Sequence, residues 1–177
     1  MGRRRQILVI GSDKGHCSKA AYRIAYQVGL EVAKRGAVLV SGGLGGVMEA
    51  ASQGAKNAEG FVIGIIPQDN KTYANKYCDA VIATGIGSAR DFLTAYSADA
   101  VIVVEGGAGT LIEVAAAYQK KIPIIAITGT GGIADKIAHT YLDDRKLEPI
   151  LAENSPSSAV KIALSLIQSE PAEGSGD

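Results

Sequence analysis

The sequence predicts an α/β protein with a doubly wound, Rossmann-like sheet that is mainly parallel, has about six or seven strands and carries helices on both faces. Three observations support this fold class. Short apolar runs alternate with longer amphipathic stretches along the chain. The first five runs consist largely of Val, Ile, Leu and Ala, as expected for strands buried on both faces of a parallel sheet. Glycine-rich turns follow most of these runs.

Each apolar run is a predicted strand, and each amphipathic stretch is a predicted helix. The strands span residues 7–10, 37–40, 61–66, 80–83, 100–104 and 123–127. The helices span about 18–35, 46–57, 88–97, 110–120, 133–142 and 156–168. Ser155 is the expected N-cap of the last helix, with Pro156 at its first position. The alternation implies βαβ units with right-handed crossovers.

Length and composition predict one domain with a short tail. The chain has 177 residues, of which 47% are apolar and 20% charged, close to the average of globular proteins. These values exclude a wholly disordered chain. We expect residues 1–168 to form a single nucleotide-binding domain. Residues 169–177 are polar and acidic, and we expect a flexible tail there.

Charge, hydropathy and cysteine content argue against several function classes. Lys and Arg together number 18, as do Asp and Glu, so the chain lacks the basic excess of a nucleic-acid surface. The apolar runs are far shorter than the roughly 18 residues of a membrane span. Cys17 and Cys78 are too few for a disulfide framework and lack metal-ligand spacing, so no metal site is expected. We expect a cytoplasmic protein.

Glycine-rich segments follow the predicted strands at residues 11–15, 41–46, 85–88, 105–110 and 129–132. In an open parallel sheet these turns meet at the carboxyl edge, where ligands bind. Glycine lets backbone N–H groups approach an anion, and a helix N-terminus favours negative charge. The alternative is that the glycines only make tight turns and close packing contacts. The predicted phosphate-binding residues are Gly11, Ser12, Gly42, Gly43, Gly45, Arg90, Gly106, Gly107, Gly109 and Thr110.

Two common nucleotide motifs are absent, which narrows the ligand class. The first turn reads Gly11-Ser12-Asp13-Lys14-Gly15, without the G-x-G-x-x-G spacing of dinucleotide sites. No stretch matches the G-x-x-x-x-G-K-[ST] of a P-loop. A phosphorylated molecule of about mononucleotide size, held by several short loops, is the remaining expectation. Asp13 and Lys14 are further candidates for contact with it.

Arg90 and Glu113 are charged residues near these loops. Thr110 and Glu113 have capping-box spacing, so Glu113 has a purely structural interpretation as a helix cap. Ser88 and Asp91 have the same spacing around Arg90. A cation in the first turn of a helix is unfavourable with the helix dipole, so Arg90 is more easily explained if it contacts an anion. The alternative for Arg90 is a solvated ion pair with Asp91 or another acid. If the protein is an enzyme, Arg90 and Glu113 are the expected catalytic pair for hydrolysis of a glycosidic bond.

The segments 41–50 and 62–67, together with Gly106-Gly107-Ala108-Gly109-Thr110-Leu111-Ile112-Glu113, resemble a known superfamily. It was once called lysine decarboxylase-like and includes the lonely-guy cytokinin-activating enzymes, whose signature is P-G-G-x-G-T-x-x-E. The resemblance implies a Rossmann-like fold, a homodimer or homotetramer, and catalytic roles for Arg90 and Glu113. It does not imply decarboxylation, because no lysine has the context of a pyridoxal-phosphate Schiff base.

Two departures from that pattern separate this chain from the hydrolases. Glu105 replaces the signature's proline, and Asp91 replaces a lysine that follows the arginine in the enzymes. Both changes weaken affinity for a highly charged ligand in the same pose. The chain looks closer to the short branch similar to molybdenum-cofactor carrier proteins.

The expected function is binding of a phosphorylated, nucleotide-like small molecule, either a nucleoside monophosphate or the molybdenum cofactor. No further cofactor is expected to be required. The alternative is a nucleoside 5′-monophosphate phosphoribohydrolase that releases free base and ribose 5-phosphate.

Overall fold

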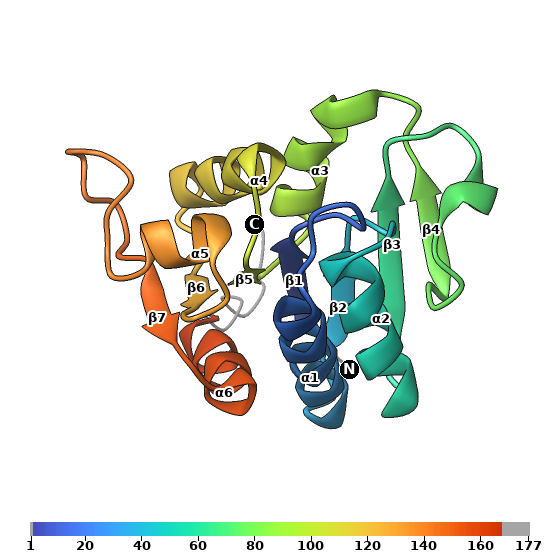
Figure 1. The fold of residues 1–177 in the computed structure, drawn as a ribbon, viewed down its shortest axis with the longest axis horizontal. Coiled ribbons are helices and arrows are strands. Elements are labelled where there is room, and N and C mark those ends of the chain that lie inside the picture. Colours follow the sequence, from blue (N-terminus) through green and yellow to red (C-terminus); the bar gives the residue numbers. More distant parts are fainter. Residues whose placement is uncertain (1, 168–177) are drawn as a thin grey trace, which may run out of the picture.

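The computed structural model describes residues 2–167, which form a seven-stranded parallel sheet covered by helices on both faces (Figure 1). The strand order is β4-β3-β2-β1-β5-β6-β7, and every neighbouring pair is parallel. The order reverses at β1, so the topological switch point lies between β1 and β5. The predicted doubly wound α/β fold is confirmed, and the sheet is parallel throughout.

The elements follow the predicted alternation. The strands are β1 (Gln6–Gly11), β2 (Val38–Ser41), β3 (Val62–Ile66), β4 (Ala80–Ala83), β5 (Ala100–Val104), β6 (Ile124–Ile127) and β7 (Leu151–Glu153). The α-helices are α1 (Lys19–Lys34), α2 (Val47–Asn57), α3 (Arg90–Tyr96), α4 (Ala108–Gln119), α5 (Gly132–Ile137) and α6 (Pro156–Leu166). Two short 3₁₀ turns, η1 (Lys71–Tyr73) and η2 (Gly87–Ala89), complete the described chain.

Most predicted boundaries agree with the structure to within one or two residues. Ser155 caps α6 as expected: its hydroxyl accepts the N–H of Ser158 at 3.4 Å, and Pro156 opens the helix. The predicted helix over 133–142 is too long, because Ala138 is extended and His139 has a φ of 59°. Strand β7 is missing from the prediction. The expected tail, residues 169–177, lies outside the described residues, so the boundary after residue 168 stays a prediction.

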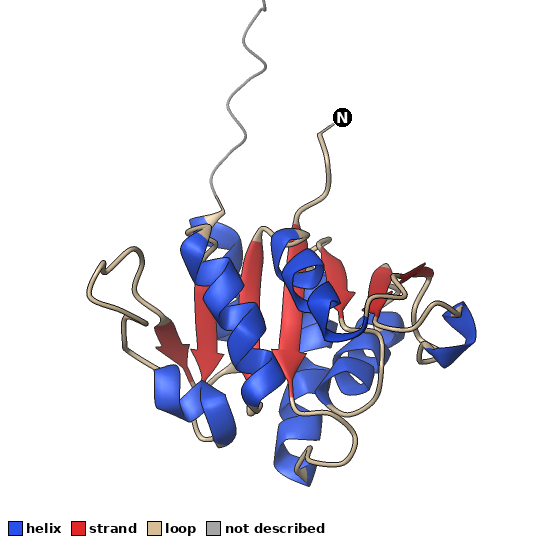
Figure 2. Ribbon diagram, turned by 90° about the horizontal axis from the view of Figure 1, so that it is seen from above, coloured by secondary structure: helices blue, strands red, loops and turns tan. Residues whose placement is uncertain are grey.

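The side-chain alternation of each strand divides the core into two layers. In β1, Ile7 and Val9 pack with α1, α2 and α6, whereas Leu8 and Ile10 pack with α3, α4 and α5. All four side chains are buried. Figure 2 shows the central strands ending at the same side of the molecule, opposite the N-terminus. The loops that follow these strands therefore converge at one edge of the sheet.

Helices α1 and α2 approach closely through glycine. A Cβ on Gly29 of α1 would overlap the backbone of Ala51 in α2, and one on Gly54 of α2 would overlap the carbonyl of Tyr26 in α1. Two backbones can approach this closely only where a side chain is missing. These glycines hold α1 and α2 together on one face of the sheet.

No helix among residues 2–167 combines the length and the apolar character needed to cross a lipid bilayer. The cytoplasmic location stays a prediction.

We expect Gly29→Ala to lower the free energy of unfolding by about 1–3 kcal/mol, because the added methyl group overpacks the contact between α1 and α2. Alanine is the better helix former, so helix propensity acts in the opposite direction. Gly109→Ala is the control, since a Cβ there meets no atom within 4 Å. That variant should match the parent or gain about 0.4–1 kcal/mol. Urea titration measures both, and equal effects would contradict the proposed close contact.

Candidate functional site

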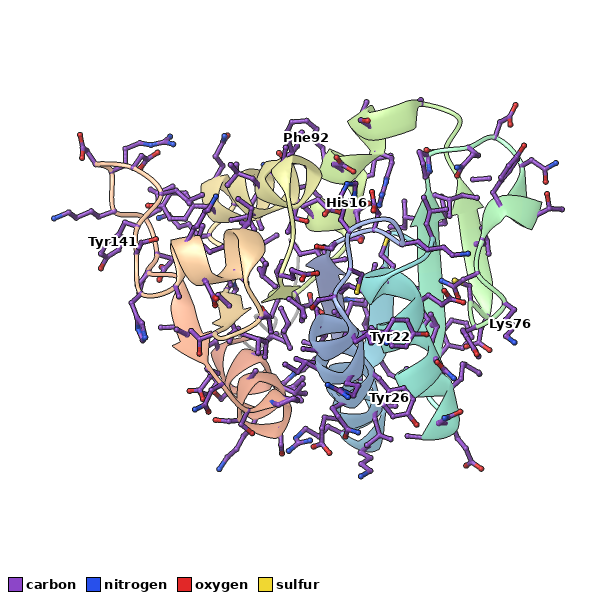
Figure 3. All side chains as sticks on the ribbon, viewed as in Figure 1. His16, Tyr22, Tyr26, Lys76, Phe92 and Tyr141 are labelled. Carbon is purple, nitrogen blue, oxygen red and sulfur yellow. The ribbon has the colours of Figure 1, made fainter. Side chains whose placement is uncertain are left out.

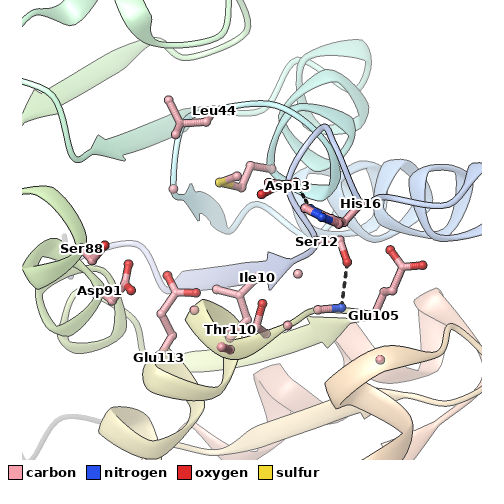
Figure 4. A pocket seen from close by; sticks show the side chains of 18 of the residues that line it. Ile10, Ser12, Asp13, His16, Leu44, Ser88, Asp91, Glu105, Thr110 and Glu113 are labelled. Carbon is pink, nitrogen blue, oxygen red and sulfur yellow. Dashed lines mark hydrogen bonds and ion pairs between the residues drawn. The ribbon is translucent and has the colours of Figure 1, made fainter.

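A cleft of about 790 Å³ opens at the carboxyl ends of the central strands (Figure 4). Its walls come from the loops after β1, β2 and β5, from the start of α3 and from the first turns of α4. It therefore lies at the switch point between β1 and β5, where ligands of open α/β sheets bind.

The structure brings most of the predicted site residues together in this cleft. The predicted glycines that line it are Gly11, Gly42, Gly106, Gly107 and Gly109. The side chains that line it include Ser12, Arg90, Thr110 and Glu113.

Gly43 and Gly45 lie outside the cleft lining. A Cβ on Gly43 would press against the Ile66 side chain at 2.6 Å, and one on Gly45 would press against Cβ of Lys14 at 2.8 Å. At these two positions the structure shows close packing, which is the alternative that the sequence left open.

N–H groups at the N-termini of α1 and α2 are hydrogen-bonded to other groups of the chain. The Ser18 hydroxyl accepts the N–H of Ala21 at 3.0 Å, and the Glu105 carboxylate accepts the N–H of Ser18 at 3.2 Å. The N–H of Val47, at the start of α2, donates to the carbonyl of Ser12 at 3.0 Å. These helices therefore offer a ligand few unpaired donors.

The loop before α5 is filled in the same way. The Asp135 carboxylate accepts the N–H groups of Gly129 and Gly131 at 2.7 and 2.9 Å. The N–H of Ile133 donates to the carbonyl of Gly106 at 2.9 Å. This glycine-rich loop closes on an internal anion and contributes only Gly132 to the cleft lining.

Helix α4 is different, because its N-terminus is open to the cleft. Its N-cap is Gly107, which provides no side-chain cap. Within residues 2–167 no acceptor is recorded for the N–H groups of residues 107–110, all of which line the cleft. The preceding N–H, on Gly106, donates to the Ser12 hydroxyl at 3.0 Å, which fixes the loop (Figure 4). Unpaired N–H groups at the positive end of a helix dipole form an anion site.

Both predicted capping boxes are wrong. Helix α4 begins at Ala108, so Thr110 lies inside its first turn and Glu113 lies in its second. Ser88 lies in η2, and the N-cap of α3 is Ala89, without a side-chain hydrogen bond. The cause at α4 is the extended backbone of Gly107, which starts the helix earlier than a side-chain cap at Thr110 would. Glu113 does not serve as a helix cap.

Arg90, Asp91 and Glu113 form a buried charged cluster on the cleft wall. Their exposed fractions are 9%, 6% and 6%. Nε of Arg90 lies 3.2 Å from Oδ1 of Asp91, and its Nη1 lies 3.7 Å from Oε1 of Glu113. Nη1 also donates to the Thr94 hydroxyl at 3.2 Å. The pairing of Arg90 with Asp91 agrees with the alternative left open for Arg90, but the pair is buried and not solvated.

Burial raises the pKa of both carboxyl groups. Loss of water raises the pKa of Glu113 to about 8, against the opposing attraction of Arg90 and with a further rise from Asp91. Burial also raises the pKa of Asp91, and Arg90 opposes this. At neutral pH Glu113 is therefore mainly protonated and able to donate a hydrogen bond.

The Glu105 carboxylate binds at the N-terminus of α1. The residue has a φ of 57°, and its carboxylate contacts the N–H of Ser18, the N-cap of α1. Figure 4 shows the side chain beside the loop that follows β5. The anion that replaces the signature proline is therefore partly compensated by the dipole of α1.

The sequence did not identify several cleft residues. Ile10, Leu44 and Met48 give the cleft apolar walls. His16 lines the mouth, where its Nδ1 lies 2.8 Å from Oδ1 of Asp13. Leu44 lies within a glycine-rich segment, and Ile10, His16 and Met48 lie within two residues of one, so counting the other residues in and beside each segment would have found them.

Lys14 does not line the cleft, unlike Asp13. Among the described residues no group of three or more His, Cys, Asp or Glu side chains is placed to hold a metal ion.

The sequence profile of the SLOG cluster4 family matches residues 4–160. The chain belongs to this family. The resemblance expected from the glycine motifs, to the lonely-guy-like Rossmann superfamily and its branch similar to molybdenum-cofactor carriers, is confirmed.

Solved structures and one sequence relative extend this assignment. The molybdenum cofactor binding protein of Rippkaea orientalis is 34% identical, with a TM-score of 0.83, over 94% of this chain and 99% of its own. The molybdenum cofactor carrier protein of Chlamydomonas reinhardtii is 30% identical, with a TM-score of 0.80, over 93% of this chain and 98% of its own. An uncharacterised protein of Archaeoglobus fulgidus is 48% identical over 115 residues, which are 65% of this chain and 74% of that protein.

Because burial raises the pKa of Glu113 from 4.5 to about 8, the folded state keeps a proton that the unfolded state has lost between these values. The contribution of protonated Glu113 to the free energy of unfolding is fully present below pH 4.5 and is lost as the pH rises through about 8. Glutamine is neutral at every pH. We therefore expect Glu113→Gln to gain stability relative to the parent between pH 5 and pH 9, by about 1.4 kcal/mol for each pH unit in the steepest part.

Urea titrations at pH 5, 7 and 9 measure this effect. The exposed Glu148→Gln is the matched control and should follow the parent. If the Glu113→Gln curve also runs parallel to the parent, the shifted pKa is wrong.

Proposed function

We propose that the protein binds a phosphorylated, nucleotide-like small molecule in the cleft, in the manner of a molybdenum-cofactor carrier. The observation that carries this proposal is the open N-terminus of α4, whose unpaired N–H groups belong to residues that line the cleft at the switch point of the sheet. Phosphate is the ligand group that such a helix end favours.

The dimensions and lining of the cleft support the same ligand class. Its volume of about 790 Å³ falls within the range of small-molecule sites. Ile10, Leu44 and Met48 supply apolar surface for a planar ring, while residues 107–110 supply donors for the phosphate. A phosphorylated pterin and a nucleoside monophosphate both combine these two parts.

The similar structures favour the molybdenum cofactor among these ligands. Two proteins described as binding or carrying this cofactor match nearly the whole chain at 34% and 30% identity. In this proposal the cofactor is cargo, and the protein requires no resident cofactor of its own.

Phosphoribohydrolase activity is a second candidate, and one observation favours it. Arg90 lies 3.7 Å from Glu113, whose pKa of about 8 keeps it protonated at neutral pH. A protonated carboxyl group in a cleft is able to act as a general acid on a leaving base. Turnover would require that this acid reaches the glycosidic bond of the bound nucleotide.

We also propose that the chain associates with a second copy of itself. Large apolar side chains lie exposed on two adjacent helices, namely Phe92, Leu93 and Tyr96 of α3 and Leu111 and Ile112 of α4. Figure 3 shows Phe92 projecting outward at this end of the molecule. Such a patch marks an association surface, and twofold self-association is the commonest way to bury one. A homodimer, or a homotetramer built from two dimers, is the expected assembly.

Gly107→Val tests the phosphate site. Its φ of −123° suits valine, and a Cβ there meets no protein atom within 4 Å, so the variant should fold. The side chain would occupy the space in front of the α4 N-terminus, and we expect affinity to fall by at least about tenfold. The exposed Ala20→Val is the control. Calorimetric titration with nucleoside 5′-monophosphates, and anaerobic loading with released molybdenum cofactor, measure binding.

Unchanged affinity in a folded Gly107→Val variant would remove α4 from the site. Chromatography of the same incubations detects any free base. Base release that is lost in Glu113→Gln would assign the hydrolase function instead of the carrier function.

Phe92→Asp tests the association surface. The side chain is 48% exposed, so the monomer should fold, whereas a charge buried between two copies is costly. We expect light scattering coupled to gel filtration to show a smaller particle than the parent. The control is Tyr73→Asp, an exposed aromatic residue on η1. A monomeric parent protein would refute the proposed association.

A further inference from the structure

The two ends of the cleft differ in chemistry. The open N-terminus of α4 provides only donors, at residues 107–110. Asp91 and Glu113 lie together farther along the cleft, away from Ser12 and Glu105 (Figure 4). Glu113 follows Gly109 by four residues on the same helix, which is roughly 6 Å along the axis. A sugar or a linker of that length would separate a phosphate at the first end from a ring at the second.

The polar groups at the second end have unused hydrogen-bonding capacity. Within residues 2–167 neither Asp91 nor Glu113 has a recorded hydrogen bond through its carboxyl group, and both contact Arg90 only as ion pairs. Nε of Arg90 is buried without a hydrogen-bond acceptor. Buried polar atoms in folded proteins are nearly always paired, and Nε of Arg90 is such an atom, whereas the carboxyl oxygens of Asp91 and Glu113 are not fully buried. All three residues line the cleft. A bound ligand is therefore the expected source of the missing partners.

The types of these groups define what the ligand ring must present. A carboxylate at Asp91 accepts hydrogen bonds, so it needs ring N–H or amino donors. The Arg90 guanidinium and a protonated Glu113 donate, so they need a carbonyl oxygen. A ring edge with a carbonyl, a ring N–H and an exocyclic amino group in sequence satisfies both. This is the 2-amino-4-oxopyrimidine edge, which guanine and pterins share.

We propose that Asp91, supported by Arg90 and Glu113, is the specificity residue that selects a ring with a 2-amino-4-oxopyrimidine edge over rings that lack the amino group. The inference rests on the proposed function, because it assigns the ring end of the ligand whose phosphate end binds α4. It also gives the replacement of lysine by Asp91 a role in ligand selection, since lysine has no acceptor for an amino group.

GMP and IMP provide the test, because they differ only in the 2-amino group. We expect calorimetry to show GMP binding at least about tenfold more tightly than IMP, since a charged acceptor rejects a ligand that leaves it unpaired. In Asp91→Asn the preference for GMP should largely disappear, because GMP loses its partners for both the ring N–H and the amino group, whereas IMP loses only the partner for its ring N–H. Retained IMP binding shows that this variant is folded. Asp69→Asn, outside the cleft lining, is the matched control and should keep the preference.

The outcomes separate this inference from the proposed function. Equal affinity of the parent protein for GMP and IMP overturns the role of Asp91 and leaves the phosphate site intact. A preference for GMP that survives in Asp91→Asn overturns it as well. Binding of neither nucleotide also overturns it, and loading with molybdenum cofactor then decides whether the proposed function fails too.

Discussion

Two hydrogen bonds that Ser12 accepts from backbone N–H groups fix the shape of the cleft. Its hydroxyl accepts the N–H of Gly106, and its carbonyl accepts the N–H of Val47, each at 3.0 Å. Ser12, which directly follows β1, thereby links the loop after β5 to the start of α2. Because Ser12 is buried, water competes little for these bonds. The loop after β5 is fixed by this contact, and its next N–H groups, at the start of α4, remain directed at the cleft.

The distribution of internal anions explains why one helix end stays available. Parallel sheets place several helix N-termini at the same edge, and each would attract negative charge. In this chain Glu105 fills the end of α1 and Asp135 fills the loop before α5. The N-terminus of α4 differs from these positions because no side chain of the described residues accepts a hydrogen bond from its first N–H groups. The site is thus defined as much by the filled positions as by the open one.

The sequence predicted the sheet better than the details of the site. Strand β5 was predictable because uninterrupted apolar runs are typical of buried parallel strands, whereas β7 is a three-residue edge strand without such a run. Strand β4 also has an apolar run, but the expectation that it is buried on both faces is wrong, because it lies at the edge of the sheet and Ile82 is 52% exposed. The capping boxes failed because spacing alone does not reveal that Gly107 is extended and starts α4 early. The burial of Arg90 beside Asp91 and Glu113 was also hidden, since it depends on how α3 packs against α4.

The position of the Glu105 carboxylate has a consequence for how long a ligand stays bound. A phosphate bound as proposed would meet the dipole of α4, while the dipole of α1 is engaged by a carboxylate of the protein. The protein would therefore attract the bound anion through the dipole of one helix only, and the nearby Glu105 carboxylate would repel it. Dissociation rates rise as such attraction weakens. In the proposed carrier role, this would limit the residence time of the cargo and favour its transfer to a receiving protein.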